Sequence, residues 1–311
     1  MPPHGAATVG TLFRDIVARL ERASLHYGHG THNARDDAGY LILHTLHLPL
    51  EDLTPYLERI VAPGEQRRIL TLVERRIREK IPVAYLTREA WLGEYSFYVD
   101  RRVIIPRSFI AELARERFEP WLRSPVRCAL DMCTGSGCLA VLLAKTFPQA
   151  KVDATDVSLG ALAVARRNVA RYRLGRRIRL VHSDLFSSLK GRSYDLIVSN
   201  PPYVNAASMR VLPREYRHEP ALALAGGADG LALVSKILAH AAEHLRPGGS
   251  LVCEIGHNRR ALERAYPAVP FAWPETSAGA DHVFVLERKA LVPLSAAELP
   301  SRPARKGQSV R

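Results

Sequence analysis

The sequence predicts a doubly wound α/β domain with a mostly parallel sheet of seven strands, preceded by a small helical domain. Three observations lead to this prediction. Apolar residues within the first 80 positions recur at helical spacing. A stretch of alternating aromatic and polar residues follows, which indicates a β-hairpin. From residue 106 onward, short apolar runs alternate with amphipathic segments, as is typical of a parallel sheet covered on both faces.

The N-terminal helical domain is assigned to residues 1–83, and we expect it to recognise the substrate. Helices are predicted within residues 8–27, 34–46 and 63–80. The hairpin is assigned to residues 84–105 and serves as a linker. Two-residue turns are expected at Gly93-Glu94 and Asp100-Arg101.

The α/β domain is assigned to residues 106–289. Helices are predicted after Gly137 and over residues 158–171 and 230–245. The final segment, 290–311, is rich in Pro, Ser, Ala, Arg and Lys and is predicted to be a disordered basic tail. The seven strands are predicted at residues 127–132, 151–155, 178–182, 194–199 and 250–255, near Phe271, and at 282–287.

Composition and charge limit the environment of the chain. The formal net charge of +13 favours an anionic partner, such as nucleic acid or a nucleoprotein, although a basic surface that serves only solubility explains it equally well. None of the four cysteines forms a C-x-x-C pair, which fits a reducing cytoplasm. The N-terminus lacks the pattern of a signal peptide, and no apolar run approaches the roughly 20 residues that span a bilayer. A cytoplasmic protein without membrane contact is expected.

A glycine-rich loop follows the first predicted strand of the α/β domain. Asp131 to Ala140 reads DMCTGSGCLA, and the glycines allow the backbone to turn sharply and approach a ligand closely. Asp156 ends the second strand, where a carboxylate can accept both ribose hydroxyls of an adenosine. Asp184 follows the third strand and can hold the adenine amine or simply cap a turn. Taken alone, this pattern also fits a dinucleotide-binding fold.

The fourth strand is followed at once by Asn200-Pro201-Pro202-Tyr203. Ligands bind at the carboxyl ends of strands in open α/β sheets, so Asn200 is expected beside the glycine-rich loop. If the substrate is an amide, the lone pair of its nitrogen is delocalised by resonance and attacks a methyl group poorly. The Asn200 side-chain carbonyl and the Pro201 backbone carbonyl can accept the two N–H groups of such an amide and orient its nitrogen for methylation. Pro201 and Pro202 stiffen the loop, and Tyr203 offers a flat face to a planar group.

Other residues carry weaker signals. Arg107 is a candidate for clamping an acidic group or the substrate backbone, although a solvated arginine is nearly as good an interpretation. His26, His29 and His32 are evenly spaced, but the glycines among them argue against a metal site, and no metal is predicted.

These motifs resemble the class I methyltransferases that modify exocyclic or amide nitrogens with S-adenosylmethionine. Together with the N-terminal helices and the hairpin, they are similar to the protein-glutamine methyltransferases (HemK/PrmB-like) over residues 10–288. Pro106-Arg107-Ser108 and the segment 215–220 look like the branch that acts on a large-subunit ribosomal protein, although Phe109 stands where a proline is expected. The resemblance implies catalysis by residues 200–203, substrate contacts from Asn200, Pro201, Tyr203 and Arg107, and a cofactor site of Asp131, Thr134, Gly135, Gly137, Asp156, Asp184, Leu185 and Asn200.

Four other functions compete with methylation of a ribosomal-protein glutamine. The relatives include release-factor glutamine methyltransferases, and nucleic-acid adenine methyltransferases share the Asn-Pro-Pro-Tyr loop. The N-terminal helices favour a protein substrate over a nucleic acid. A non-catalytic adenosine-binding module would not need Asn200, and a dehydrogenase would need a catalytic His or Lys near its nicotinamide. Ribosomal RNA near the protein substrate would account for the basic charge.

Overall fold

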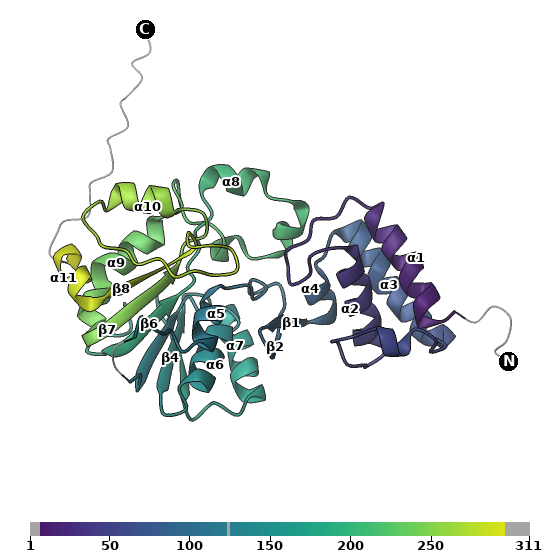
Figure 1. Ribbon diagram of the computed structural model, residues 1–311, viewed down its shortest axis with the longest axis horizontal. Helices are drawn as coiled ribbons and strands as arrows, with labels where there is room; N and C mark the ends of the chain where they lie inside the picture. Colours follow the sequence, from purple (N-terminus) through teal and green to yellow (C-terminus); the bar gives the residue numbers. More distant parts are fainter. Residues whose placement is uncertain (1–6, 123–124, 296–311) are drawn as a thin grey trace, which may run out of the picture.

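The computed structural model describes residues 7–122 and 125–295. A group of helices at the N-terminal end lies beside a larger unit built around a sheet, and a two-stranded hairpin lies between them (Figure 1). The N-terminal group comprises α1 (Val9–Glu21), α2 (Ala34–Thr45), the short 3-10 helix η1 (Thr54–Tyr56), α3 (Pro63–Glu79) and α4 (Val83–Thr87).

The sequence sets where the N-terminal helices begin. The Thr8 hydroxyl accepts a hydrogen bond from the Thr11 N–H at the start of α1, and the Asn33 side chain accepts one from the Asp36 N–H at the start of α2. Pro63 occupies the first turn of α3, where its missing N–H costs nothing. These helices bury their own apolar cluster, which includes Leu12, Ile16, Leu41, Ile42, Ile69 and Val73.

The predicted hairpin is present as β1 (Glu89–Leu92) and β2 (Tyr95–Tyr98), an antiparallel pair joined at Gly93-Glu94. Gly93 has a φ of +60°, which the tight turn requires. A turn is also present next to the second expected position, where the Val103 N–H donates to the Asp100 carbonyl, but it is centred on Arg101-Arg102, one residue later than predicted. The prediction is wrong for residues 84–87, which form a helical turn because the Pro82 carbonyl accepts the N–H groups of Tyr85 and Leu86.

The large sheet has six strands in the order β5-β4-β3-β6-β7-β8, and only β8 runs antiparallel to its neighbour. Chain order reverses between β3 and β6, and ligands bind at such a switch point in open α/β sheets. The strands are β3 (Cys128–Met132), β4 (Lys151–Asp156), β5 (Ile178–His182), β6 (Tyr194–Ser199), β7 (Leu245–Glu254) and β8 (Val283–Glu287).

The predicted seventh strand near Phe271 is not formed. In that segment only Ala272 pairs with the sheet, through an isolated bridge to Val285. Pro270 and Pro274 flank the bridge, and neither has the N–H that would extend a ladder. The sheet is therefore a six-stranded version of the predicted doubly wound fold.

Helices cover both faces of the sheet (Figure 1). One buried cluster involves α5 (Ile110–Arg115), α6 (Cys138–Thr146) and α7 (Leu159–Arg171). The other involves α9 (Ala232–His244), α10 (Arg259–Ala265) and α11 (Arg288–Ser295). Between β6 and α9 the chain forms α8 (Ala206–Val211) and the 3-10 helices η2 (Arg214–His218) and η3 (Ala221–Ala223).

The segment predicted to be a basic tail begins as a helix. Residues 290–295 belong to α11, because Leu291 is fully buried against the second cluster, and composition alone does not reveal such packing. The rest of the predicted tail, residues 296–311, lies outside the described residues. Among the helices that the structure describes, none is long and apolar enough to cross a membrane.

Candidate active site

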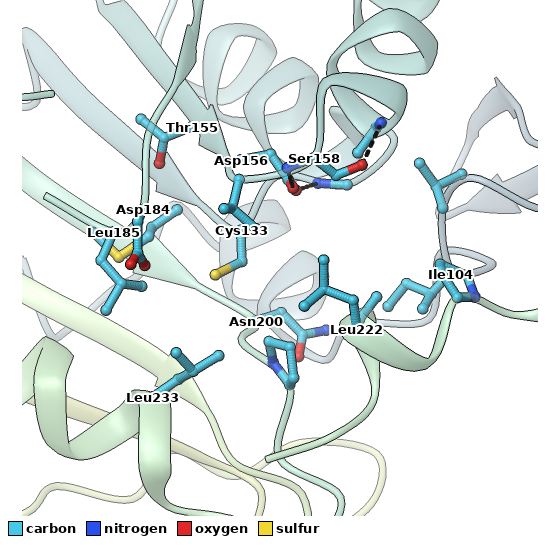
Figure 2. A pocket seen from close by; sticks show the side chains of 18 of the residues that line it. Ile104, Cys133, Thr155, Asp156, Ser158, Asp184, Leu185, Asn200, Leu222 and Leu233 are labelled. Carbon is cyan, nitrogen blue, oxygen red and sulfur yellow. Dashed lines mark hydrogen bonds between the residues drawn. The ribbon is translucent and has the colours of Figure 1, made fainter. Parts of the chain in front are cut away.

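A cavity of about 330 Å³ opens at the carboxyl edge of the sheet. Its wall includes Gly135 after β3, Asp156 at the end of β4, Asp184 after β5 and Asn200 after β6. Figure 2 shows Asp156, Asp184 and Asn200 around one shared space, although they come from different strands. Parallel pairing causes this convergence, since Met132 of β3 lies opposite Ser199 of β6 and the two following loops start side by side.

Asp131 and Thr134 lie beneath the glycine-rich loop and do not line the cavity. The Asp131 carboxylate is fully buried and accepts hydrogen bonds from the Thr134 hydroxyl and, at 2.9 Å, from the Ala140 N–H. Burial raises the pKa of Asp131 to about 7. Both residues therefore tie the start of α6 to the end of β3 and give the loop its shape, so their predicted part in the cofactor site is indirect.

The two glycines of the loop differ in what surrounds them. Gly135 has a φ of +54° and lines the cavity, and a Cβ there would meet no atom within 4 Å. Gly137 has a φ of +79°, and a Cβ would lie 3.1 Å from the Cβ of Ala165 on α7. Gly135 thus leaves its backbone open to a ligand, whereas Gly137 allows α6 and α7 to pack closely.

The Asp156 carboxylate is anchored at the edge of the cavity by two backbone donors. One oxygen accepts the Gly135 N–H at 2.9 Å and the other accepts the Ser158 N–H at 2.8 Å. Each oxygen keeps a second lone pair for another donor, such as a ribose hydroxyl. Burial raises the pKa of Asp156. Asp184 and Leu185 line the same cavity, and the Asp184 side chain makes no hydrogen bond in the part of the chain that the structure describes.

Asn200 projects into the cavity from the end of β6 (Figure 2). The Ser199 hydroxyl donates to the Met132 carbonyl at 3.0 Å and fixes the loop against β3. Among residues 7–122 and 125–295, the Asn200 side chain has no hydrogen-bond partner, so its carbonyl is available to a ligand. Pro202 also lines the cavity, and Pro201 is buried.

Tyr203 is directed away from this cavity. Its hydroxyl donates to a carboxylate oxygen of Glu254 at 3.1 Å, and its ring lies so close to Gly256 that a Cβ there would be 2.6 Å from a ring carbon. The fully buried Glu254 also accepts the Ser108 hydroxyl and the Phe109 N–H. Burial raises the pKa of Glu254. Tyr203 therefore holds the loop of residues 200–203 against β7, and its predicted ring contact with a planar substrate group stays a prediction.

Arg107 also lies outside the cavity, in a two-pronged hydrogen-bonded pair with Glu219 at 2.6 and 2.7 Å. Glu219 further accepts the Ile105 N–H, and His29 Nε2 lies 3.7 Å from it. Burial alone would raise the pKa of Glu219, but His29 and Arg107 outweigh it and lower the pKa to about 2. The acid that Arg107 binds is thus part of the chain itself, next to the cavity-lining Pro220.

A second buried ionic group joins the N-terminal helices to the same loop. Arg76 of α3 donates to Asp37 of α2 at 2.7 Å and to Glu215 of η2 at 3.3 Å. It also donates to the His26 carbonyl, and the His26 N–H donates to Glu215. The segment that walls the cavity is therefore attached to the N-terminal helices by charged groups.

Sequence reasoning missed several residues of the site. Glu254 could have been singled out, because it is an acid near the end of a strand predicted to be fully buried. Leu222, Leu233 and Lys236 line the cavity without belonging to any motif, and Cys133, inside the glycine-rich loop, also lines it but is not predicted as a site residue. Only their position in space identifies them.

The fold and this site define a class I S-adenosylmethionine-dependent methyltransferase. Residues 119–213 match the family model "Methyltransferase small domain", and residues 12–87 match "PrmC N-terminal domain". Proteins described as ribosomal protein uL3 glutamine methyltransferase from Neisseria meningitidis serogroup A and Bordetella pertussis are 56% and 54% identical to this chain; the alignments cover 92% and 91% of this chain and 94% and 96% of those proteins. The chain belongs to this family of protein-glutamine methyltransferases.

Proposed function

We propose that this enzyme methylates a glutamine side-chain amide in ribosomal protein uL3, within the cytoplasm. The main support is the identity of 56% over 94% of a relative that bears this name. The Asn200 amide, which faces the cavity without a partner among the described residues, is the feature of the site that suits an amide substrate. Ribosomal RNA near the substrate is a further part of the proposal, and the net charge of +13 supports it.

The cavity suits the cofactor by its chemistry. Asp156 and Asp184 offer carboxylate oxygens to hydroxyl and amine donors, and Leu185 supplies an apolar wall. Gly135 adds backbone without a side chain in the way. When bound, S-adenosylmethionine supplies the methyl group from its positively charged sulfonium. Asn200, which lines the same cavity, carries no net charge that would oppose that sulfonium.

The catalytic loop would act on the substrate by orientation. The Asn200 side-chain carbonyl and the Pro201 backbone carbonyl accept the two N–H groups of the glutamine amide. This would draw electron density toward the nitrogen and direct it at the methyl group. As the new N–C bond forms and the S–C bond breaks, the nitrogen would release one of its two protons to solvent. Pro201 and Pro202 keep the loop stiff, and the hydrogen bond from Tyr203 to Glu254 fixes its far end. Orientation of this kind contributes on the order of 7 kcal/mol at the favourable end.

The N-terminal helices, which precede the hairpin, would recognise the substrate protein. Their buried ionic contacts with η2 place them next to the wall of the cavity. A protein that lies against them can thus extend a loop toward Asn200.

The test is methylation of purified uL3 with S-adenosylmethionine, followed by peptide mass spectrometry. We expect one added methyl group on a glutamine, none when that glutamine is replaced by glutamate, and a much lower rate of methylation when the enzyme carries Asn200→Ala. Peptide-chain release factor and an adenine-containing RNA serve as competing acceptors. Methylation of either one in preference to uL3 would contradict the proposal.

A further inference from the structure

A second, strongly basic cleft lies where the N-terminal helices meet the methyltransferase domain. It has a volume of about 510 Å³ and is separate from the cofactor cavity. Its walls come from α2, from the turn between α4 and β1, from the end of β2, and from α7. We call it the arginine cleft, and its principal residues are His44, Arg88, Glu89, Tyr98, Arg167 and Arg171.

Positive charge dominates the arginine cleft. The cleft holds the guanidinium groups of Arg88, Arg167 and Arg171 and a single carboxylate, that of Glu89. One Glu89 oxygen lies 3.5 Å from Arg171 Nη2, and the other lies 3.8 Å from His44 Nε2. Arg167 stacks on the Tyr98 ring, with its guanidinium carbon 3.6 Å from the ring centre. The Arg88 side chain is exposed and makes no hydrogen bond or ion pair with any described residue. One carboxylate against three arginines leaves a net charge of about two for an anion to neutralise.

The arrangement of these arginines fits a chain of phosphates better than a single anion. Arg167 and Arg171 are four residues apart on α7, so they lie about 6 Å apart along the helix axis. Exposed Arg166 and Arg173 lie nearby in the sequence but outside the cleft lining, and neither forms an ion pair within the described chain. A guanidinium binds phosphate oxygens in pairs and keeps its charge at all accessible pH values. Successive cations along one helix therefore match the regularly spaced charges of a nucleic-acid strand.

The arginine cleft is also within reach of the reaction. Ser158 caps the start of α7 and lines the cofactor cavity. Arg167 and Arg171 follow it by nine and thirteen residues, which correspond to about 14 and 20 Å along the helix. We propose that the arginine cleft binds the phosphate backbone of RNA, so that a ribosomal protein can be methylated while it carries its RNA. This inference rests on the proposed function for its RNA-bound substrate, but the cleft itself can be tested without that substrate.

The experiment measures binding of a fluorescein-labelled RNA hairpin by anisotropy over a range of salt concentrations. The test variant is Arg167→Glu/Arg171→Glu, and the single variant Arg88→Glu replaces a side chain that forms no ion pair with the described residues. The matched control is Arg260→Glu/Arg264→Glu, an exposed pair with the same spacing and the same charge change on α10, on the far side of the sheet from α7 (Figure 1). Binding of S-adenosylhomocysteine checks that each variant is folded.

We expect the double cleft variant to bind the hairpin at least about 10-fold more weakly at low salt. Its slope of log affinity against log salt should be smaller by about two, because two phosphates of the RNA are no longer neutralised by an arginine. Arg88→Glu should weaken binding in the same direction, and the α10 control should bind like the parent. On a uL3–RNA complex, the methylation rate of the cleft variant should fall in parallel.

Three results would overturn the inference. They are parental RNA affinity and salt slope in both cleft variants, an equal loss of affinity in the α10 control, and preferential binding of polyglutamate over the hairpin at the cleft. Failure of the parent enzyme to methylate purified uL3 would instead refute the proposed function, whatever the RNA measurements give.

Discussion

Replacing Asn200 by alanine should separate catalysis from stability. The Asn200 side chain is half-buried and makes no hydrogen bond in the described structure, so its removal breaks no native hydrogen bond and should leave the unfolding midpoint nearly unchanged. One of the two acceptors proposed for the substrate amide disappears. Because that acceptor gains strength only as the nitrogen becomes positive, its removal should cost about 3–4 kcal/mol in the transition state. The corresponding loss is on the order of 10²–10³ in kcat with little change in KM.

Steady-state kinetics with purified uL3 would measure this loss. Asn205→Ala is a matched control on the same segment, since Asn205 caps α8 by accepting the Ser208 N–H at 2.9 Å. It should lose about 1 kcal/mol of stability and keep its kcat. Asn200→Asp sharpens the test, because a carboxylate still accepts hydrogen bonds but attracts the sulfonium. It should bind S-adenosylmethionine at least as tightly as the parent and turn over more slowly. Near-parental kcat in Asn200→Ala would refute the proposed role of this loop.

Three further perturbations follow from the contacts of the site. Asp156→Ala should weaken S-adenosylmethionine binding by about 1–3 kcal/mol in calorimetry, whereas unchanged affinity would place the cofactor elsewhere. Arg76→Met leaves two buried carboxylates unpaired and should lower the free energy of unfolding by about 3–5 kcal/mol in urea titrations, while Arg75→Met, at an exposed pair, should cost less than about 1 kcal/mol. The lowered pKa of Glu219 stabilises the fold above its unfolded pKa of about 4.5, and this contribution is lost as pH falls toward 2. The stability advantage of the parent over Glu219→Gln should therefore shrink by about 1 kcal/mol between about pH 5 and about pH 3.5, and a pH-independent difference would contradict the ion pair.

The local sequence was sufficient to predict the class of the enzyme and the residues that meet at the centre of its cavity. The glycine-rich loop, Asp156 and Asn200 each follow a strand whose apolar run is short and continuous. Parallel strands align their carboxyl ends, so the order of motifs along the chain already implies that Gly135, Asp156 and Asn200 meet at one edge. The same regularity explains why the predicted bounds of most strands and helices in the α/β domain agree with the structure to within a few residues.

The sequence pattern could not predict contacts between segments that are far apart along the chain. The sequence offers an acidic group or the substrate backbone as partners of Arg107, and the structure pairs it with Glu219, which lies 112 residues further along the chain. Tyr203 donates to Glu254 across 51 residues, and Arg76 bridges to Glu215 across 139. The spacing of charged residues along the chain does not indicate which residue of opposite charge will be buried beside each of them.

The sequence by itself thus determined the fold class, the glycine-rich loop and the position of Asn200 at the cavity, because periodicity and turn residues act over a few positions. Only the tertiary structure decided the six-stranded sheet, the helix at residues 288–295, the pairing of Arg107 with Glu219 and of Arg76 with Glu215, and the arginine cleft. Each of these depends on which side chains are buried together. That choice is made by packing and by the pairing of buried charges across the whole chain, and local preference does not encode it.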